Sequence, residues 1–265
     1  MNAVLQSAPK AAMHPDEWAV RVELAACYRV FALLGWTEMI YNHITVRLPD
    51  SVTGGEKQFL INPFGLHYRE VQASNLVKVD IEGKVLSGGP WGINAAGFAP
   101  HAALHAHVPG AHCVMHTHTT AGMAVACSRR GITITNFYAA QLGGRIAYHD
   151  FEGITVHGDE GPRLVAAIVG DGAAPPKPAL VLRNHGLLAW GGTLPECFYT
   201  LWLMQRSCEI QLAGQVLGEP IPIAPEIQQR CQDDAQRHYA RDGMGQDVFD
   251  ALLRQVDRSD RGWRD

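Results

Sequence analysis

The sequence predicts one α/β domain with a central, largely antiparallel sheet and helices on its faces. Short segments of alternating or continuous apolar character are spread along the chain, and stretches with apolar residues at helical spacing separate them. No internal repeat and no clear linker divides the 265 residues, and that length is sufficient for one large domain.

The N-terminal part of the chain predicts an arm, a helix and several strands. Residues 1–13 are small and polar and are expected to form a flexible arm. The helix is expected to begin near Pro15, to carry an apolar stripe, and to end at Gly35. Strands are expected in HITVRL (43–48), QFLIN (58–62) and LVKVDIEGKVL (76–86), the last of which forms a hairpin that turns at Glu82-Gly83.

The middle of the chain alternates between helical and strand patterns. Helices are expected over 96–108, 119–129 and 160–170, and strands over 112–118 and 132–138. RIAYHDFEG is expected to be a strand or a loop, and the Gly- and Pro-rich residues 170–178 predict a surface loop.

The C-terminal part predicts the last strands and the longest helix. ALVLRNHGLLAWGG (179–192) is read as two apolar strands that meet at Asn184-His185-Gly186, and Thr193 then caps a long helix. The domain itself is expected to span 14–220. A polar, helical extension over 221–265 is expected to pack on the domain or on a neighbouring subunit.

Composition and charge narrow the class of function. The net charge of −4 provides no electrostatic footprint for nucleic acid, and no Lys/Arg run suggests a membrane surface. No apolar run is long enough to span a bilayer or to serve as a signal peptide. The six Cys form no C-x-x-C pair and are expected to be reduced. We therefore expect a cytoplasmic protein with a small-molecule substrate and with no nucleic-acid or membrane partner.

The chain contains 13 histidines, and they are its most informative polar residues. In a strand, His116 and His118 project to the same face, which is the geometry that two imidazoles need to share a tetrahedral metal ion. His185, at the junction of two apolar strands, would complete a three-ligand site with an open position. The pair alone is a weak motif, and the alternatives are half-buried strand histidines and a bystander in an Asn-x-Gly turn.

His101 and His105 form a rival pair at i, i+4 on the Ala-rich helix. The order H-A-A-L-H lacks the Glu that makes such a helix a hydrolase site. We therefore expect this pair to pack in the core or to support other groups more than to bind an ion.

Several segments, spread over about residues 20 to 215, occur in the order and spacing of one family. They are YNHITVR, FLINPFGL, LVKVDIEGKVL, NAAGFAPHAALHAHVPGAHCVMHTHTTAG and LVLRNHGLLAWG. With these motifs the chain resembles the class II aldolase/adducin family. The resemblance implies an α/β/α sandwich around an antiparallel sheet and a homotetramer with active sites between subunits. It also implies one divalent ion held by His116, His118 and His185, for which zinc is expected and manganese, cobalt or iron remains open.

The chain departs from the sugar-phosphate aldolases of that family in two places. The resemblance implies a catalytic Glu nineteen residues before His116, but Gly97 stands there. The pairs that cradle phosphate in those aldolases correspond here to Tyr41-Asn42, Phe64-Gly65 and Ala95-Ala96. A phosphate needs several donors, and these residues offer few, so a phosphorylated sugar is not the expected substrate.

We therefore expect a divalent-metal-dependent lyase of aldolase or decarboxylase type that acts on a small unphosphorylated oxo- or hydroxy-acid. The ion would stabilise an enolate-like charge. The acid/base candidates are His149, Asp150 and Tyr138, with Tyr239 of a neighbouring subunit also open. The expected substrate-binding or orienting residues are Asn42, Phe64, Gly65 and Thr119, with Arg183 and Asn184 beside the ligands.

Two other functions remain open at this point. The AGF segment that contains Gly97 is shared with adducin-type heads, and this resemblance implies a non-catalytic oligomeric scaffold. A metal-dependent dehydratase or epimerase of a sugar-derived substrate is the other alternative. The loss of the Glu favours the scaffold, whereas retention of His116, His118 and His185 favours an enzyme, because a scaffold has no need of them.

Overall fold

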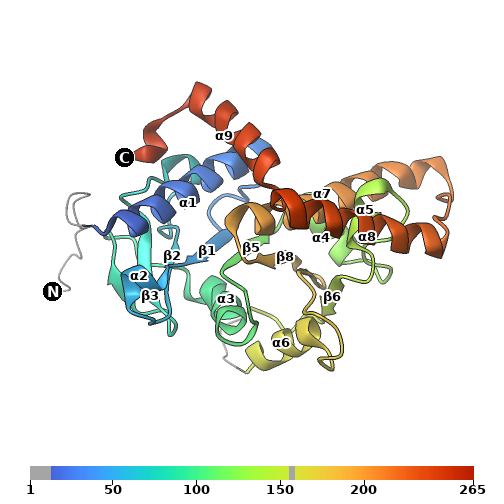
Figure 1. Ribbon diagram of the computed structural model, residues 1–265, viewed down its shortest axis with the longest axis horizontal. Helices are drawn as coiled ribbons and strands as arrows, with labels where there is room; N and C mark the ends of the chain where they lie inside the picture. Colours follow the sequence, from blue (N-terminus) through green and yellow to red (C-terminus); the bar gives the residue numbers. More distant parts are fainter. Residues whose placement is uncertain (1–12, 155–158) are drawn as a thin grey trace.

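A single sheet organises the described part of the chain, and all of its neighbouring strands are antiparallel except β6 and β7, which are parallel. The computed structural model describes residues 13–154 and 159–265 (Figure 1). The order of the strands is β4 (Val85–Ser87), β3 (Val77–Asp80), β2 (Gln58–Ile61), β1 (His43–Arg47), β5 (Cys113–Thr117), β8 (Gly186–Gly191), β7 (Ala179–Leu182) and β6 (Ile146–His149). The predicted arm over 1–13 lies outside the described residues except for Met13.

Helices cover both faces of the sheet and confirm the predicted α/β/α arrangement (Figure 1). The α-helices are α1 (Pro15–Leu34), α2 (Asp50–Thr53), α3 (Ala95–His107), α4 (Thr120–Ala126), α5 (Phe137–Leu142), α6 (Gly161–Val169), α7 (Leu194–Gly214), α8 (Pro225–Asp242) and α9 (Gln246–Ser259). Short 3₁₀ turns are η2 (Tyr68–Glu70), η3 (Gln215–Leu217) and η4 (Gly262–Arg264). None of the helices in the described ranges is long and apolar enough to cross a bilayer.

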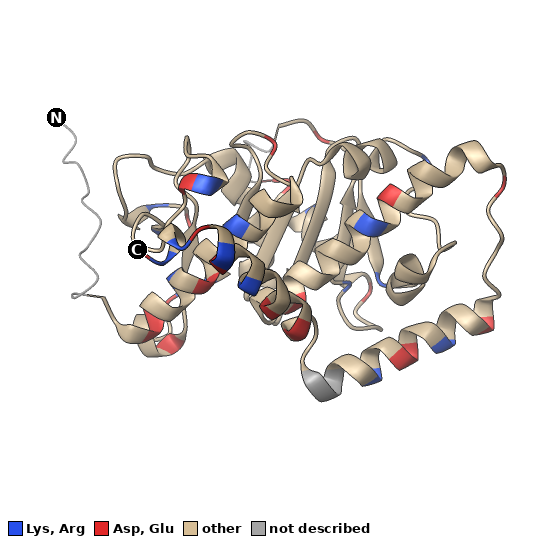
Figure 2. Cartoon of the chain, turned by 90° about the horizontal axis from the view of Figure 1, so that it is seen from above, with Lys and Arg blue, Asp and Glu red and all other residues tan. Residues whose placement is uncertain are grey.

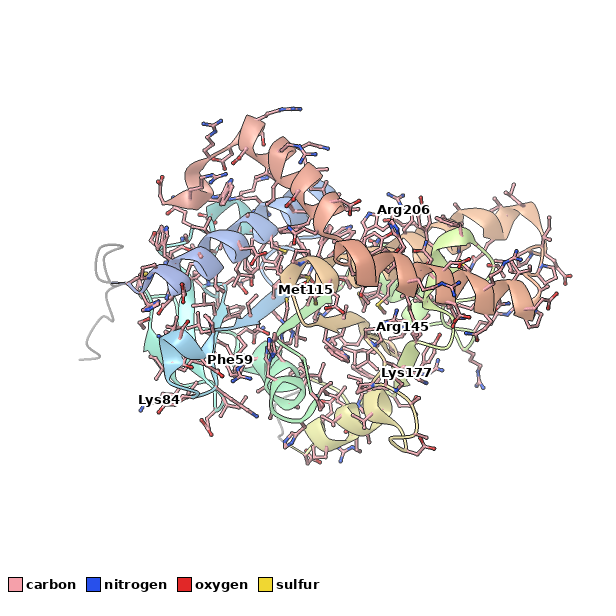
Figure 3. All side chains as sticks on the ribbon, viewed as in Figure 1. Phe59, Lys84, Met115, Arg145, Lys177 and Arg206 are labelled. Atoms are coloured by element: carbon pink, nitrogen blue, oxygen red, sulfur yellow. The ribbon has the colours of Figure 1, made fainter. Side chains whose placement is uncertain are left out.

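The alternation of β5 assigns its side chains to two different layers. Met115 is fully buried in the core beneath α1 and α7 (Figure 3). Val114, on the other face, packs in the core formed with α3 and α6. His116 has the parity of Val114, so it lies on the α3/α6 face. The sheet therefore places the strand histidine under the smaller of the two helical layers.

Most predicted elements are confirmed, but the strand expected over 132–138 is wrong. Asn136 caps α5 instead, because its side-chain oxygen accepts from the backbone N–H groups of Tyr138 and Ala139. Backbone N–H groups earlier in the segment are taken by side chains: Ile132 donates to the Tyr148 hydroxyl, and Thr133 donates to Gln211. The alternating apolar pattern therefore packs on the core without a strand partner.

The extension over 221–265 consists of two helices with different surroundings. α9 packs against α1 and buries Phe249 against Phe198 of α7 (Figure 1). α8 lies apart from the sheet in Figure 2 and contacts α5, where the Tyr239 hydroxyl donates to Gln141. Cys231 on α8 is one of the free cysteines, and no cysteine is in a disulfide among the residues described here.

Candidate metal centre

Three imidazoles converge where β5 ends and β8 begins. His116 is on β5, His118 follows that strand directly, and His185 occupies the turn between β7 and β8. One ligand atom from each of the three lies within 4.8 Å of the others. The Nε2 atoms of His116 and His118 are 2.6 Å apart. We refer to His116, His118 and His185 as the triad.

The turn that carries His185 depends on its two neighbours. Asn184 has φ 58°, a left-handed conformation that Asn tolerates, and its N–H donates to Ala126. Gly186 lies against β5, where a Cβ would come 2.3 Å from the Thr117 carbonyl oxygen and 3.3 Å from the rings of His116 and His118. Only glycine therefore lets the turn approach closely enough to bring His185 to the other two imidazoles.

Hydrogen bonds behind the triad orient its ligand atoms. His116 Nδ1 donates to the Leu187 carbonyl oxygen at 2.9 Å, so its Nε2 is unprotonated and can serve as a metal ligand. The backbone N–H of His118 donates to Asn42 Oδ1 at 2.9 Å, and Asn42 Nδ2 donates to the Trp36 carbonyl at the same distance. Supporting bonds of this kind fix the tautomer and the orientation of metal-binding imidazoles.

Burial keeps the triad neutral. It lowers the pKa of His116 well below 6.5, with His118 contributing, and it lowers the pKa of His118 to about 4. It also lowers the pKa of His185, although the Glu160 carboxylate opposes this effect. Neutral imidazole is the form that binds a metal ion, so the donor set fits a divalent cation such as zinc.

The triad opens onto a cavity of about 480 Å³ between the sheet, α3 and the start of α6. Its wall is mainly apolar and aromatic, with Tyr41, Phe64, Met123 and Phe151 among the lining residues. The polar side chains of the wall, besides the triad and the Tyr41 hydroxyl, are His43, Asn94, Asn184 and Glu160, and no Lys or Arg lines the cavity in the part of the chain that the structure describes.

The predicted substrate-binding residues occupy different places relative to this cavity. Phe64 is in its wall, whereas Gly65 turns the chain beside Trp91 with φ 105°. Asn42 is fully buried behind His118, where both ends of its amide are bonded. Thr119 caps α4 and donates to Gln205 at 2.5 Å. Of these four residues, only Phe64 lines the cavity directly.

The predicted acid/base candidates lie outside the cavity wall. His149 is buried at the end of β6, where its Nε2 donates to Glu160 Oε1 at 3.2 Å. The Asp150 side chain is 92% exposed and lies 3.4 Å from Arg183. Tyr138, on α5, packs edge-on against Trp202 of α7. The predicted groups are therefore not brought together around the triad.

Glu160 is a carboxylate in the cavity wall that no sequence pattern predicted. It stands directly before α6, is 8% exposed, and lines the triad cavity. Its side chain makes no capping bond to α6 and accepts from His149 instead. A Glu at the start of a predicted helix is commonplace, and no local pattern connects it with His185. Only the packing of α6 against α3 brings it there.

Position 97 on α3, where the resemblance implies a Glu, has no room for a side chain, because the His43 ring lies against it. A Cβ on Gly97 would lie 2.5 Å from His43 Cδ2 and 2.6 Å from His43 Nε2. His43 is held in place by a hydrogen bond of 2.8 Å from its Nδ1 to His101 Nε2. The imidazole of His43 therefore occupies the volume that a side chain at position 97 would need.

Comparison with known proteins places this geometry in a family. Residues 22–212 match the class II aldolase and adducin N-terminal domain. A Pseudomonas aeruginosa protein, provisionally called an aldolase class 2 protein, is 40% identical over 94% of this chain and 93% of its own length. Alpha-adducin of Rattus norvegicus is 40% identical over 96% of this chain but only 35% of the adducin. A crystal structure of an aldolase II superfamily protein from Pseudomonas syringae superposes with a TM-score of 0.85 at 37% identity, over 97% of this chain and 99% of that one.

Proposed function

This chain belongs to the class II aldolase and adducin family, and we propose that it is a divalent-metal-dependent carbon–carbon lyase. The proposed substrate is a small unphosphorylated oxo- or hydroxy-acid, and zinc is the proposed ion, with manganese, cobalt or iron as alternatives. We place the protein in the cytoplasm.

The observation that carries the proposal is the convergence of the triad on one side of a mainly apolar cavity. The three imidazoles supply the ligands of an open catalytic site, and their supporting hydrogen bonds leave His116 Nε2 free to bind. When bound, a divalent ion supplies the positive charge that stabilises an enolate-like intermediate. A scaffold gains nothing from holding three neutral histidines in this arrangement.

The charge of the cavity wall supports an unphosphorylated acid. No Lys or Arg lines the wall in the described ranges, and Glu160 adds a carboxylate. The phosphate of a sugar phosphate would find no cationic side chain there. A divalent ion held by the triad could instead neutralise a single carboxylate, so a small acid is a better electrostatic match than a phosphate ester.

We assign the acid/base role to Glu160, with His149 as its positioning residue. Glu160 lines the cavity, and His149 holds its Oε1 at 3.2 Å. The proton that leaves or returns to the substrate carbon would move to or from this carboxylate. His149, which the sequence suggested as the acid/base itself, would then act through Glu160.

Neighbouring subunits are part of the proposal. Tyr41, Phe151 and Ile154 line the cavity, yet 51%, 55% and 78% of their surfaces are exposed. Apolar side chains that are this exposed at the mouth of a site are suited to contact with another chain. A homotetramer with active sites between subunits would provide that cover, and light scattering of the purified protein would measure its mass.

The test combines metal content with activity toward matched substrates. Protein purified without a His tag should contain about one divalent ion per chain and should cleave small oxo- or hydroxy-acids in preference to sugar phosphates. Glu160→Gln should lower kcat by about 10²–10⁴-fold without loss of the ion. Glu152→Gln is the matched control, because Glu152 lies 3.6 Å from His149 but pairs with Arg163 outside the cavity.

The second candidate is a non-catalytic oligomeric scaffold, which the 40% identity to rat alpha-adducin favours. On this alternative, the wild-type protein would be a fully folded, metal-free oligomer without activity on any of the acids. That result would contradict the lyase. Activity on sugar phosphates alone would contradict the proposed substrate class, and full activity of Glu160→Gln would contradict the role of Glu160.

A further inference from the structure

A second group of histidines lies on the same face of the sheet as the triad. His43 and Thr45 on β1 face His101 and His105 on α3, and all four residues are no more than 6% exposed. His43 Nδ1 lies 2.8 Å from His101 Nε2. Thr45 Oγ1 lies 2.7 Å from both His101 Nδ1 and His105 Nε2. We refer to His43, His101 and His105, joined through Thr45, as the histidine chain.

The imidazoles of the histidine chain are neutral at neutral pH. None of them hydrogen-bonds to a carboxylate in the described part of the molecule. Phe59 stacks on His105 with ring centroids 4.4 Å apart and shields it from water. Burial lowers the pKa of His105 to about 3 and those of His43 and His101 well below 6.5.

The last member of the chain determines the direction of every hydrogen bond in it. His105 Nδ1 lies 2.6 Å from the Ala111 carbonyl oxygen, which can only accept, so Nδ1 carries the proton and Nε2 is bare. The Thr45 hydroxyl must then donate to His105 Nε2 and accept from His101 Nδ1. His101 Nε2 is consequently bare and accepts from His43 Nδ1.

This sequence of bonds leaves His43 with an unprotonated Nε2. The His43 ring lines the triad cavity, and its centroid is 5.1 Å from that of His116. No hydrogen-bond partner of this Nε2 is found among the residues described. The absence of a side chain at Gly97 gives the ring its room, since a Cβ there would come 2.6 Å from Nε2. A bare acceptor is thus held beside the triad.

We propose that His43 Nε2 is a fixed hydrogen-bond acceptor that makes the site select 2-hydroxy acids over 2-oxo acids. A hydroxyl can donate to Nε2, whereas a keto oxygen, like a carboxylate or phosphate oxygen, can only accept. A bound 2-oxo acid would shield this nitrogen from water and leave it unpaired, which is unfavourable. The inference rests on the proposed function, because it places the substrate acid at the triad.

The tautomers can be measured in the metal-free protein by ¹⁵N NMR of the imidazoles. We expect His43, His101 and His105 each to carry the proton on Nδ1, whereas free histidine favours Nε2. Thr45→Val removes the hydroxyl without changing a residue of the cavity wall, and the proton of His43 should then no longer be confined to Nδ1. Thr45→Ser keeps the hydroxyl and should preserve it. A wild-type protein with the His43 proton on Nε2 would overturn the inference.

Selectivity can be measured with lactate and pyruvate, which differ in one hydroxyl, by visible absorption of the cobalt-loaded protein. Wild type and Thr45→Ser should prefer lactate, and Thr45→Val should lose about tenfold of that preference with pyruvate binding unchanged. An unchanged preference in Thr45→Val would overturn the role of His43. Cobalt that fails to bind at the triad would instead contradict the proposed function, and the metal-free NMR experiment separates that failure from a wrong tautomer.

Discussion

The triad and the histidine chain are built from the same side chain, yet they use its nitrogen atoms in opposite ways. In the triad, one ligand atom of each ring turns toward a common point within 4.8 Å. In the histidine chain, the nitrogens bond to one another and to Thr45 and end at the Ala111 carbonyl. Burial lowers the pKa in both clusters, so a depressed pKa does not distinguish a metal-binding histidine from one held in a hydrogen-bonded chain. The two kinds differ in the atoms to which their ring nitrogens bond.

The two clusters meet at one rung of the sheet. His43 is the direct partner of His116 in the β1–β5 ladder, so the two rings lie side by side on the α3/α6 face. One side of this rung ends in the triad and the other leads into the histidine chain. Substitutions on the two sides should therefore separate metal binding from stability.

The largest expected effect is the loss of the ion from the triad side. His185→Ala should reduce the metal content from about one ion per chain to none, because the remaining pair cannot complete the site. The unfolding free energy of the metal-free protein should change little, since His185 lies partly exposed in a turn. Metal analysis after dialysis measures the first quantity and urea unfolding the second. His112→Ala, at an exposed position before β5, is the control.

A change in the histidine chain should have the reverse effect. His101→Ala should lower the unfolding free energy by about 3–5 kcal/mol, because it leaves a cavity and removes the partners of His43 and Thr45. The metal content should stay near that of wild type. His107→Ala, at the exposed end of α3, should have little effect on either quantity. Loss of the ion together with an unchanged stability would show that the two clusters are assigned to the wrong roles.

Gly97→Ala tests the contact between α3 and His43. Alanine ordinarily stabilises a helix relative to glycine by about 1 kcal/mol, but here its Cβ would meet the His43 ring at 2.5 Å. We expect a net loss of about 1–3 kcal/mol in unfolding free energy, together with a weaker preference for lactate over pyruvate. Gly214→Ala, at the end of α7, meets no atom within 4 Å and should not destabilise the protein. A stabilised Gly97→Ala would mean that His43 moves away freely.

The effect that is smallest at neutral pH is the contribution of the histidine chain to acid sensitivity, which develops only as the pH falls. The folded pKa of His105 is about 3, and its unfolded pKa is near 6.5, so below that value the unfolded state binds a proton that the folded state refuses. Stability is therefore lost as the pH falls from about 6.5 toward 3, by about 1.4 kcal/mol per pH unit for His105. His105→Gln should reduce the slope of unfolding free energy against pH by that amount. An equal slope in His105→Gln and in the exposed variant His107→Gln would contradict the assignment.

The sequence by itself determined the order of most elements and pointed to the three histidines that converge. Apolar periodicity, the Thr193 cap and the turn at Asn184-His185-Gly186 are local signals, and strand alternation alone puts His116 and His118 on one face. The strand predicted over 132–138 was wrong although apolar residues alternate in it, because N–H groups of this segment donate to side chains, among them Tyr148 and Gln211, and not to a neighbouring strand. Local patterns cannot report where a backbone group finds its partner.

Only the tertiary structure decided what surrounds the triad. Glu160 reaches the cavity because α6 packs against α3, and no spacing along the chain predicts this contact. The tautomer of His43 depends on the Ala111 carbonyl, to which His43 is linked through His101, Thr45 and His105. The spacing of His116 and His118 is a property of one backbone segment, whereas the carboxylate and the acceptor arise where separate elements meet, so their roles depend on packing.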